Sequence, residues 1–264
     1  MLGEIVWQYQ LPDYLKQYTN PGFDAELLSN NNILFLLPGN GVYEINRNGT
    51  IVWSYKDAKV SHDADRLPNG NTLFVFGKSD STDDAQVKEV NPRGEIVWEW
   101  HAKDYFYKTP YTGIYKEGWT HTNAVTRLPN GNTIISLRNF NLVVEVDPKG
   151  LVVRTYGEGL FEAQHDPEIL PNGNMLVASH NKPHKAIELD PNEAVVWDFI
   201  VLEKENRPLR DANRLPNGNT LITGSKTILE VTSGGEIVWE LKMNATLKDA
   251  SGEGFYKANR INPQ

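Results

Sequence analysis

No cysteine occurs in the 264 residues, which excludes disulfide bonds, thiolate metal sites and a thiol nucleophile. Basic residues are in deficit: 26 Lys and Arg stand against 34 Asp and Glu, and the net charge of −8 disfavours nucleic acid as a partner. Long apolar runs are missing too, both of the length of a membrane span and of the kind found in signal peptides. We therefore expect a soluble protein with no membrane insertion and no nucleic-acid partner.

These absences leave the compartment open. Without cysteine, redox chemistry does not distinguish the two sides of a membrane. An extracytoplasmic location, periplasmic or secreted, is favoured if a signal peptide has been removed, and a cytoplasmic one otherwise. The composition indicates no particular oligomeric state.

A short turn motif recurs six times along the chain. Leu-Pro-Asn-Gly-Asn begins at Leu67, Leu128, Leu170 and Leu215, and diverged copies begin at Leu28 and Ile261. Each intact copy is followed by a short apolar run, and Asn-Gly before such a run is a strong hairpin signal. We expect type I′ turns in which both Asn and Gly have positive φ, each joining a first strand to a second.

A second motif follows each hairpin. It reads Gly-Glu-Ile-Val-Trp at 94–98 and 235–239, and related versions end at Trp53, Val153 and Trp197. An alternating run and a turn precede it, which predicts two more strands and makes each repeat a four-stranded meander. Four-stranded repeats of about 40 residues with a Trp in a fixed place are typical of β-propeller blades. The repeated Trp is expected to pack between blades, and a solenoid is disfavoured because no segment resembles a cap.

The expected fold is all-β: one β-propeller domain, residues 1–264, of four-stranded antiparallel blades. Complete strand sets are predicted at about 23–55, 62–100, 121–155, 165–199 and 211–241. Residues 2–9 read as an isolated outer strand and 255–261 as an isolated inner one. We therefore favour a six-bladed register with an incomplete sixth blade, and five-bladed closure is the alternative.

Candidate site residues come from comparing the repeats with one another. The third residue before each turn is small in almost every repeat, as packing near the axis requires, whereas the fifth is chemically rich. In a propeller the connections between blades gather on one face, where binding sites are usual. The fifth positions, at the start of the innermost strands, are Phe23, His62, Asn123, His165, Arg210 and Tyr256.

Second strands should return to the same face and add further polar groups. Arg138 is expected beside His121 and Asn123, and His180 beside His165. Two residues apart on a strand, His121 and Asn123 should point the same way. His, Asn and Arg together on an acidic protein favour a compact oxyanion such as sulfate. Zinc bound by His62, His121 and His165 is the competing reading, and the neighbouring arginines argue against it.

A long aromatic insertion, residues 103–118, precedes His121. It includes Tyr115 and is followed by Trp119, and its position predicts that it overhangs the same mouth. We expect Tyr115 and Trp119 to contact substrate by stacking on a phenyl ring. The alternative is a loop that packs on its own side chains.

At these residues the sequence resembles the PAPS-independent arylsulfate sulfotransferases. The resembling stretches are Trp-Thr-His-Thr-Asn at 119–123, Ile-Ser-Leu-Arg-Asn at 135–139, and Gln-His-Asp at 164–166 leading into the turn at Leu170. The resemblance implies a six-bladed propeller that moves a sulfuryl group from an aryl sulfate to a phenol without a nucleotide or other cofactor. His165 would be the nucleophile, and His121, Asn123 and Arg138 would hold the sulfate oxygens.

The remaining fifth-position residues are assigned to substrate binding. These are His62, Arg210, Tyr256 and Phe23, together with Trp119 and Tyr115, and no metal is expected. Two other functions stay open. One is a non-catalytic propeller that binds a small anion or a protein partner. The other is a quinoprotein, which is weaker because the vicinal cysteines often found there are absent.

Overall fold

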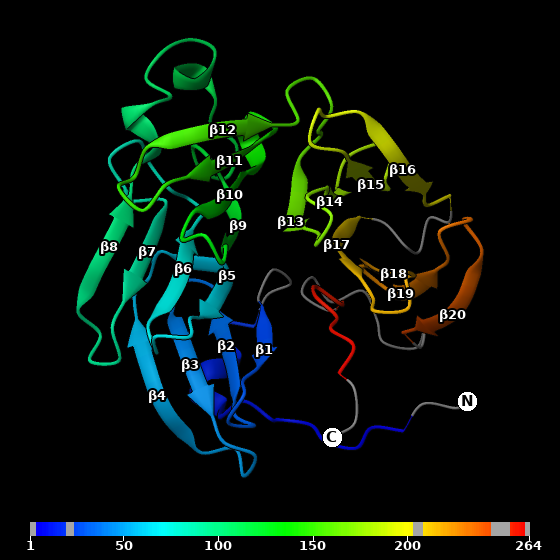
Figure 1. Cartoon of the computed structure of the whole chain (residues 1–264). Helices are drawn as coiled ribbons and strands as arrows, with labels where there is room; N and C mark the ends of the chain where they lie inside the picture. The colour runs from blue at the N-terminus through cyan, green and yellow to red at the C-terminus, as the bar shows by residue number, and fades with distance from the viewer. Residues whose placement is uncertain (1–3, 20–23, 203–207, 244–253, 262–264) are drawn as a thin grey trace.

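The computed structural model describes residues 4–19, 24–202, 208–243 and 254–261. Five four-stranded antiparallel sheets are arranged around a centre (Figure 1), each a meander in which consecutive strands are neighbours. The strands are β1 (Ala25–Leu27), β2 (Ile33–Leu37), β3 (Gly41–Ile45), β4 (Ile51–Lys56); β5 (Val60–Arg66), β6 (Thr72–Phe76), β7 (Val87–Val90), β8 (Ile96–Trp100); β9 (Thr122–Arg127), β10 (Thr133–Leu137), β11 (Leu142–Val146), β12 (Val152–Tyr156); β13 (Gln164–Ile169), β14 (Met175–Ser179), β15 (Lys185–Leu189), β16 (Val195–Ile200); β17 (Leu209–Arg214), β18 (Thr220–Gly224), β19 (Thr227–Val231) and β20 (Ile237–Lys242). Short helices are α1 (Asp13–Lys16), η1 (Ala102–Asp104), η2 (Tyr111–Gly113) and η3 (Arg138–Phe140).

The propeller fold is confirmed, and the five predicted strand sets match the five blades to within a few residues. The sixth position is different. Residues 4–10 and 255–261 form no strand, although they were expected to be the outer and inner strands of a sixth blade. In Figure 1 the N-terminal run crosses the outer side of the opening between the first and fifth blades, and the C-terminal run lies near the centre.

The Asn-Gly turns differ from the expected type. Gly70 has φ +85°, whereas Asn69 is not among the residues with positive φ. The Gly70 N–H donates to Leu67 O, and the Leu67 N–H donates to Asn71 O. This is the pattern of a type I turn followed by a left-handed glycine, and Pro68 supplies the φ that the turn needs at its second residue. The type I′ prediction was wrong because the preceding proline selects the three-residue loop.

The repeated tryptophans lie between blades, as expected. Trp53 donates its indole N–H to Pro92 O in the next blade at 2.9 Å, and Trp197 donates to Ser233 O at 3.0 Å. An arginine from the next inner strand covers each of these rings: Arg66 lies 4.8 Å from the Trp53 centroid and pairs with Glu44 at 3.0 Å. Cation–π contact and a partly buried ion pair thus join neighbouring blades.

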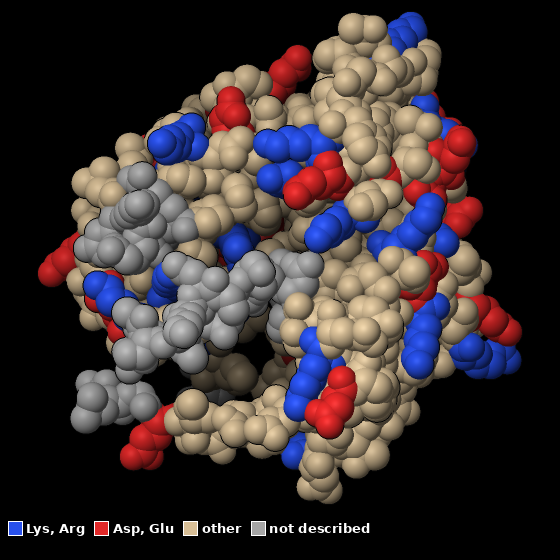
Figure 2. Space-filling model, turned by 180° about the vertical axis from the view of Figure 1, so that it is seen from behind, with Lys and Arg blue, Asp and Glu red and all other residues tan. Residues whose placement is uncertain are grey.

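The core is divided into apolar clusters between neighbouring blades, and the second strand of each blade supplies much of it. Strands β6, β10, β14 and β18 are buried along their whole length. No helix among the described residues is long and apolar enough to span a membrane. From behind, Lys and Arg side chains are interspersed with Asp and Glu over the described surface (Figure 2).

Candidate active site at the channel mouth

A polar pocket of about 220 Å³ opens at one mouth of the propeller. Its walls come from the starts of inner strands, from the loops that join second to third strands, from the insertion before β9 and from the C-terminal segment, which is the face that the repeats predicted. The lining residues are Pro38, His62, Lys78, Glu117, His121, Arg138, His165, His180, Arg210 and Tyr256. Six of the ten residues predicted for the site line this pocket: His62, His121, Arg138, His165, Arg210 and Tyr256.

Irregular backbone aims the inner-strand residues into the pocket. The pairing register shifts between Val60 and Ala64 in β5 and between His165 and Glu168 in β13. His62 and His121 have φ of 68° and 49°, in the left-handed region. Bulges and left-handed residues change the direction in which side chains point. Such backbone is energetically costly and persists only where the surrounding structure stabilises it, and it is often found at functional sites.

His62 and His121 form a contacting pair. Their Nε2 atoms are 3.2 Å apart, and both rings are buried. Nδ1 of His121 lies 3.0 Å from Glu117 O, so it carries a proton, and its neutral ring then accepts at Nε2 from His62. Burial, with Arg138 as the next cause, lowers the pKa of His121 to about 4. Both rings are therefore neutral near pH 7.

His165 lies on the other side of the pocket with a defined tautomer. Its Nδ1 is 3.0 Å from Ala163 O, which places the proton on Nδ1 and the lone pair on Nε2. Its ring stacks on His180 at 4.7 Å with an interplanar angle of 17°. Burial, and then the neighbouring His180, lower the pKa of His165 well below its usual value. A neutral imidazole with a free Nε2 lone pair is the form that acts as a nucleophile.

Positive charge dominates the pocket. Arg138, Arg210 and Lys78 line it together with a single carboxylate, that of Glu117. Arg210 lies 5.6 Å from the Tyr256 ring centroid and donates to Phe255 O at 3.2 Å. Because the histidines are neutral, the cations supply the field, which suits a compact anion.

The remaining predicted residues lie elsewhere. Asn123 is buried and donates to Gln164 O at 2.8 Å, and so supports the strand that carries His165. It does not share the direction of His121, because the left-handed backbone at His121 breaks the strand alternation. Trp119 is buried and donates to Tyr111 O, whereas Tyr115 is 72% exposed; neither lines the pocket. Phe23 lies outside the described residues.

Two aromatic residues of the insertion pack on each other and on rings that follow it in the chain. Phe106, Tyr111, Trp119 and Phe140 form a cluster with ring centroids 4.8 to 5.4 Å apart. The insertion reaches the pocket through Glu117, and Asn139 holds this end by donating to the carbonyls of residues 116, 118 and 119. The alternative of a packed loop therefore describes Phe106 and Tyr111, whereas Tyr107 and Tyr115 are exposed.

Below the pocket, a buried lysine lies among carboxylates. Nζ of Lys257 is 2.7 Å from Asp63 Oδ1, 3.1 Å from Asp166 Oδ1 and 3.5 Å from Asp24 Oδ1. Burial raises the pKa of Asp24 to about 7, and the facing carboxylates raise the pKa of Lys257 well above its usual value. Each of these residues follows a fifth-position residue, so the network lies directly beneath the pocket.

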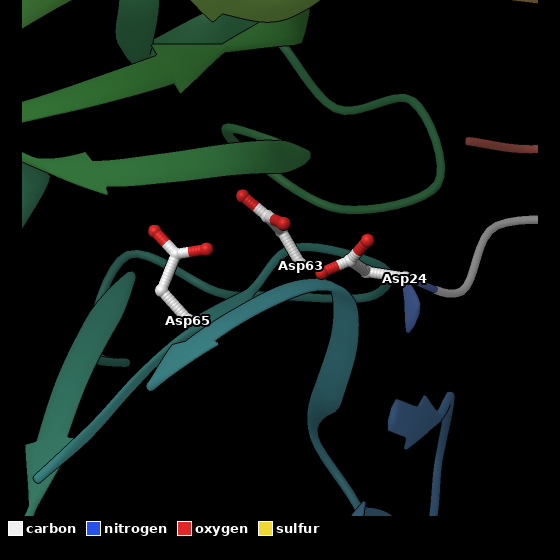
Figure 3. A group of neighbouring side chains, drawn as sticks. All are labelled: Asp24, Asp63 and Asp65. Carbon is white, nitrogen blue, oxygen red and sulfur yellow. The ribbon is translucent and has the colours of Figure 1, made fainter. Parts of the chain in front are cut away.

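Asp24, Asp63 and Asp65 are also the residues whose geometry comes nearest to a metal site in the described chain. Their nearest oxygens lie within 4.8 Å of one another (Figure 3). The ammonium of Lys257 already contacts two of these carboxylates. Among the described residues, His62, His121 and His165 do not form a comparable group.

Comparison of the repeats overlooked two parts of the site. The first part is a set of charged residues at the fourth position before the turn, which is Asp in four repeats and Lys in one. An ionic ring could have been inferred from this pattern: Asp24, Asp63, Asp166, Asp211 and Lys257. The other part is Asp80, which accepts hydrogen bonds from the N–H groups of Thr120 and His121 at 3.1 Å. No repeated position marks Asp80, so only the folded chain identifies it.

The fold and this pocket define a β-propeller with a cationic, histidine-rich anion site at its channel mouth. The model of the arylsulfotransferase (ASST) family matches residues 1–159 of the chain. The protein therefore belongs to the arylsulfotransferase family, which supports sulfuryl transfer in general and small aryl compounds as substrates. The match includes His62, His121 and Arg138 and ends before His165. No curated protein matches the chain closely enough to count as a relative.

Solved structures show the same fold at low identity. A protein of unknown function from Bacteroides caccae has a TM-score of 0.67 and 21% identity, covering 94% of this chain and 89% of its own. A streptogramin B lyase has a TM-score of 0.60 and 11% identity, covering 86% and 71%. Virginiamycin B lyase from Staphylococcus aureus has a TM-score of 0.58 and 15% identity, covering 88% and 72%. At these identities the likeness concerns the fold alone.

Proposed function

We infer that the protein transfers a sulfuryl group from an aryl sulfate to a phenol through a sulfohistidine at His165. The observation that carries this proposal is the neutral His165 ring, with its lone pair on Nε2, in a pocket lined by Arg138, Arg210 and Lys78. Family membership gives the general reaction, and the pocket supplies the candidate for the group that carries the sulfuryl between donor and acceptor.

The reaction has two steps. Nε2 of His165 attacks sulfur, an N–S bond forms, the ester S–O bond breaks, and the phenolate leaves with the bonding pair. A second phenol then attacks the same sulfur and gives its proton to solvent water, and the N–S bond breaks with its electron pair returning to Nε2, which restores the neutral imidazole. The charge that gathers on the three sulfuryl oxygens faces the cationic side chains of Arg138 and Arg210, which line the same pocket.

The aryl groups are expected to lie toward the solvent side of the pocket. The pocket is small and polar, and Tyr256 is the one Phe, Tyr or Trp residue of its lining. A site that holds the sulfuryl group tightly and the ring loosely would accept many phenols. We therefore propose broad acceptor use, limited by the acidity of the phenol more than by its shape.

The test follows 4-nitrophenolate release from 4-nitrophenyl sulfate, with and without phenol. We expect phenol to stimulate release, and His165→Ala to abolish it. His101→Ala is the matched control, because His101 lies outside the pocket and pairs with Glu99. Protein quenched with donor alone should carry one sulfuryl group on the peptide that contains residues 164 and 165, and phenol should remove it.

Other outcomes separate the alternatives. A label on His62, His121 or His180 would support transfer through a sulfohistidine, but the nucleophile would be that histidine and not His165. Release that does not depend on phenol would indicate hydrolysis. If no label forms while sulfate still binds, the protein is the non-catalytic anion binder that the sequence also allowed.

A further inference from the structure

Glu117 supplies the one carboxylate among the residues that line the pocket at the channel mouth. Its side chain is exposed, whereas His121 and His165 are buried, so the carboxylate lies toward the solvent side of the pocket. Within the described residues this carboxylate has no hydrogen bond and no ion pair. A negative charge in a pocket for anions weakens the binding of a sulfate ester, because like charges repel. The carboxylate therefore calls for a role other than donor binding.

The backbone holds Glu117 at a fixed place on the rim of the pocket. Its φ of 56° lies in the left-handed region. Its carbonyl accepts a hydrogen bond from the N–H of Ser79 at 2.9 Å and another from Nδ1 of His121 at 3.0 Å. Asn139 donates to the carbonyls on either side of it, at 2.9 and 3.0 Å. The side chain thus starts from a defined position beside the ring of His121.

The second step of the proposed reaction needs a proton acceptor, because a phenol is a weak nucleophile until its proton is lost. The histidines do not supply one. Nε2 of His165 carries the sulfuryl group at that stage, and Nε2 of His121 already accepts from His62 at 3.2 Å. Nδ1 of His62 is buried, out of reach of an acceptor that enters from solvent. Burial lowers the pKa of His180 to about 3, which makes it a weak base.

The other polar groups of the lining do not take up a proton either. Arg138, Arg210 and Lys78 are cations. Burial raises the pKa of Tyr256 above its usual value, so its hydroxyl keeps its proton. Among the lining residues, Glu117 is then the accessible group with a free lone pair on the side where an acceptor enters.

We propose that the carboxylate of Glu117 is the general base for the acceptor phenol. In the second step the phenol gives its proton to an Oε atom of Glu117 while its oxygen bonds to sulfur, and the N–S bond breaks with its electron pair returning to Nε2 of His165. The carboxylic acid then passes the proton to solvent water, which restores the carboxylate. This assignment rests on the proposed transfer through His165 and concerns its second step alone, because the phenolate of the first step leaves as an anion.

Glu117→Gln separates the two steps. It keeps the length of the side chain and the backbone carbonyl that His121 contacts, and it removes the proton acceptor. The whole protein is first mixed with 4-nitrophenyl sulfate alone, and the burst of 4-nitrophenolate and the mass of the sulfated protein are measured. We expect a burst at the wild-type rate or slightly faster, since one negative charge near the anionic donor is gone. The burst also shows that the variant is folded.

The sulfated protein is then freed of donor and mixed with an acceptor at a mildly alkaline pH, and loss of the sulfuryl mass is timed. With phenol, the Glu117→Gln variant should lose the group at least about tenfold more slowly than the wild type, because general bases typically contribute about 10²–10⁴-fold. With 4-nitrophenol, which is ionised at that pH and has no proton to give, the variant should react as fast as the wild type. Glu158→Gln is the matched control, because Glu158 is exposed and lies outside the pocket, and it should match the wild type with both acceptors.

Each other result decides between the two proposals. If the wild type forms no sulfated protein, transfer through a sulfohistidine fails, and the role of Glu117 fails with it. If the wild type is sulfated and Glu117→Gln passes the group to phenol at the wild-type rate, the sulfohistidine stands and the general base is not Glu117. A variant that is slowed equally with both acceptors, or already in the burst, would show that Glu117 shapes the pocket and does not take the proton.

Discussion

Lys257 offers the sharpest test of how the ring is held together. Replacing it with methionine keeps most of the side-chain volume and removes the ammonium from Asp24, Asp63 and Asp166. Asp24 and Asp63 are 4% and 1% exposed, so solvent cannot take over the role of the ammonium. Removal of one partner from a buried ion pair costs about 3–5 kcal/mol, and we expect Lys257→Met to fall in that range at pH 7.

The loss should depend on pH in a defined direction. Burial raises the pKa of Asp24 from 3.8 to about 7, so the folded chain binds more protons than the unfolded chain between these values. The contribution of Asp24 to stability therefore falls as pH rises through that window. Without the ammonium, the pKa values of Asp24 and Asp63 rise further. The destabilisation by Lys257→Met should be largest at pH 7 and shrink toward pH 4, where the carboxyls are protonated.

The assay is urea unfolding of wild type and variant at several pH values, followed by tryptophan fluorescence. Lys149→Met, at an exposed turn, is the matched control and should change the free energy of unfolding by less than about 0.5 kcal/mol. The double variant Lys257→Met with Asp63→Asn should recover part of the loss. A loss below about 1 kcal/mol at pH 7, or one independent of pH, would refute the reasoning.

Three further predictions concern the pocket. Arg138→Ala should retain slow transfer, with kcat reduced roughly a hundredfold or more, because loss of one preorganised donor costs about 3 kcal/mol. An unchanged kcat would show that Arg138 does not stabilise the transition state. Burial lowers the pKa of His165 well below 6.5 and that of His121 to about 4, so both stay neutral on mild acidification, and kcat/KM should show no loss between pH 7 and about 5.5. Tyr115→Ala should leave KM for 4-nitrophenyl sulfate unchanged, because this exposed ring lies outside the pocket; a clear rise in KM would show that the insertion closes over the substrate.

Local sequence signals determined the architecture and most of the pocket. Turn residues and strand alternation act over a few positions, so the repeats predicted the five complete four-stranded blades, although they were placed in a six-bladed register with an incomplete sixth blade. Comparison of one position across the repeats found His62, His165, Arg210 and Tyr256, because propeller symmetry brings equivalent positions to the same mouth. The single domain of 1–264 stays a prediction.

Only the tertiary structure shows which side chains enter the pocket and which buried charges pair with one another. Asn123 bonds to a neighbouring strand while His121 enters the pocket, because a left-handed residue held by Asp80 interrupts the strand period. Lys257 meets Asp63 across 194 positions of sequence, and that ion pair exists only once the ring has formed. Turns and strands follow from neighbouring residues, whereas side-chain direction at a bulge and the pairing of buried charges depend on groups brought together by the closed fold.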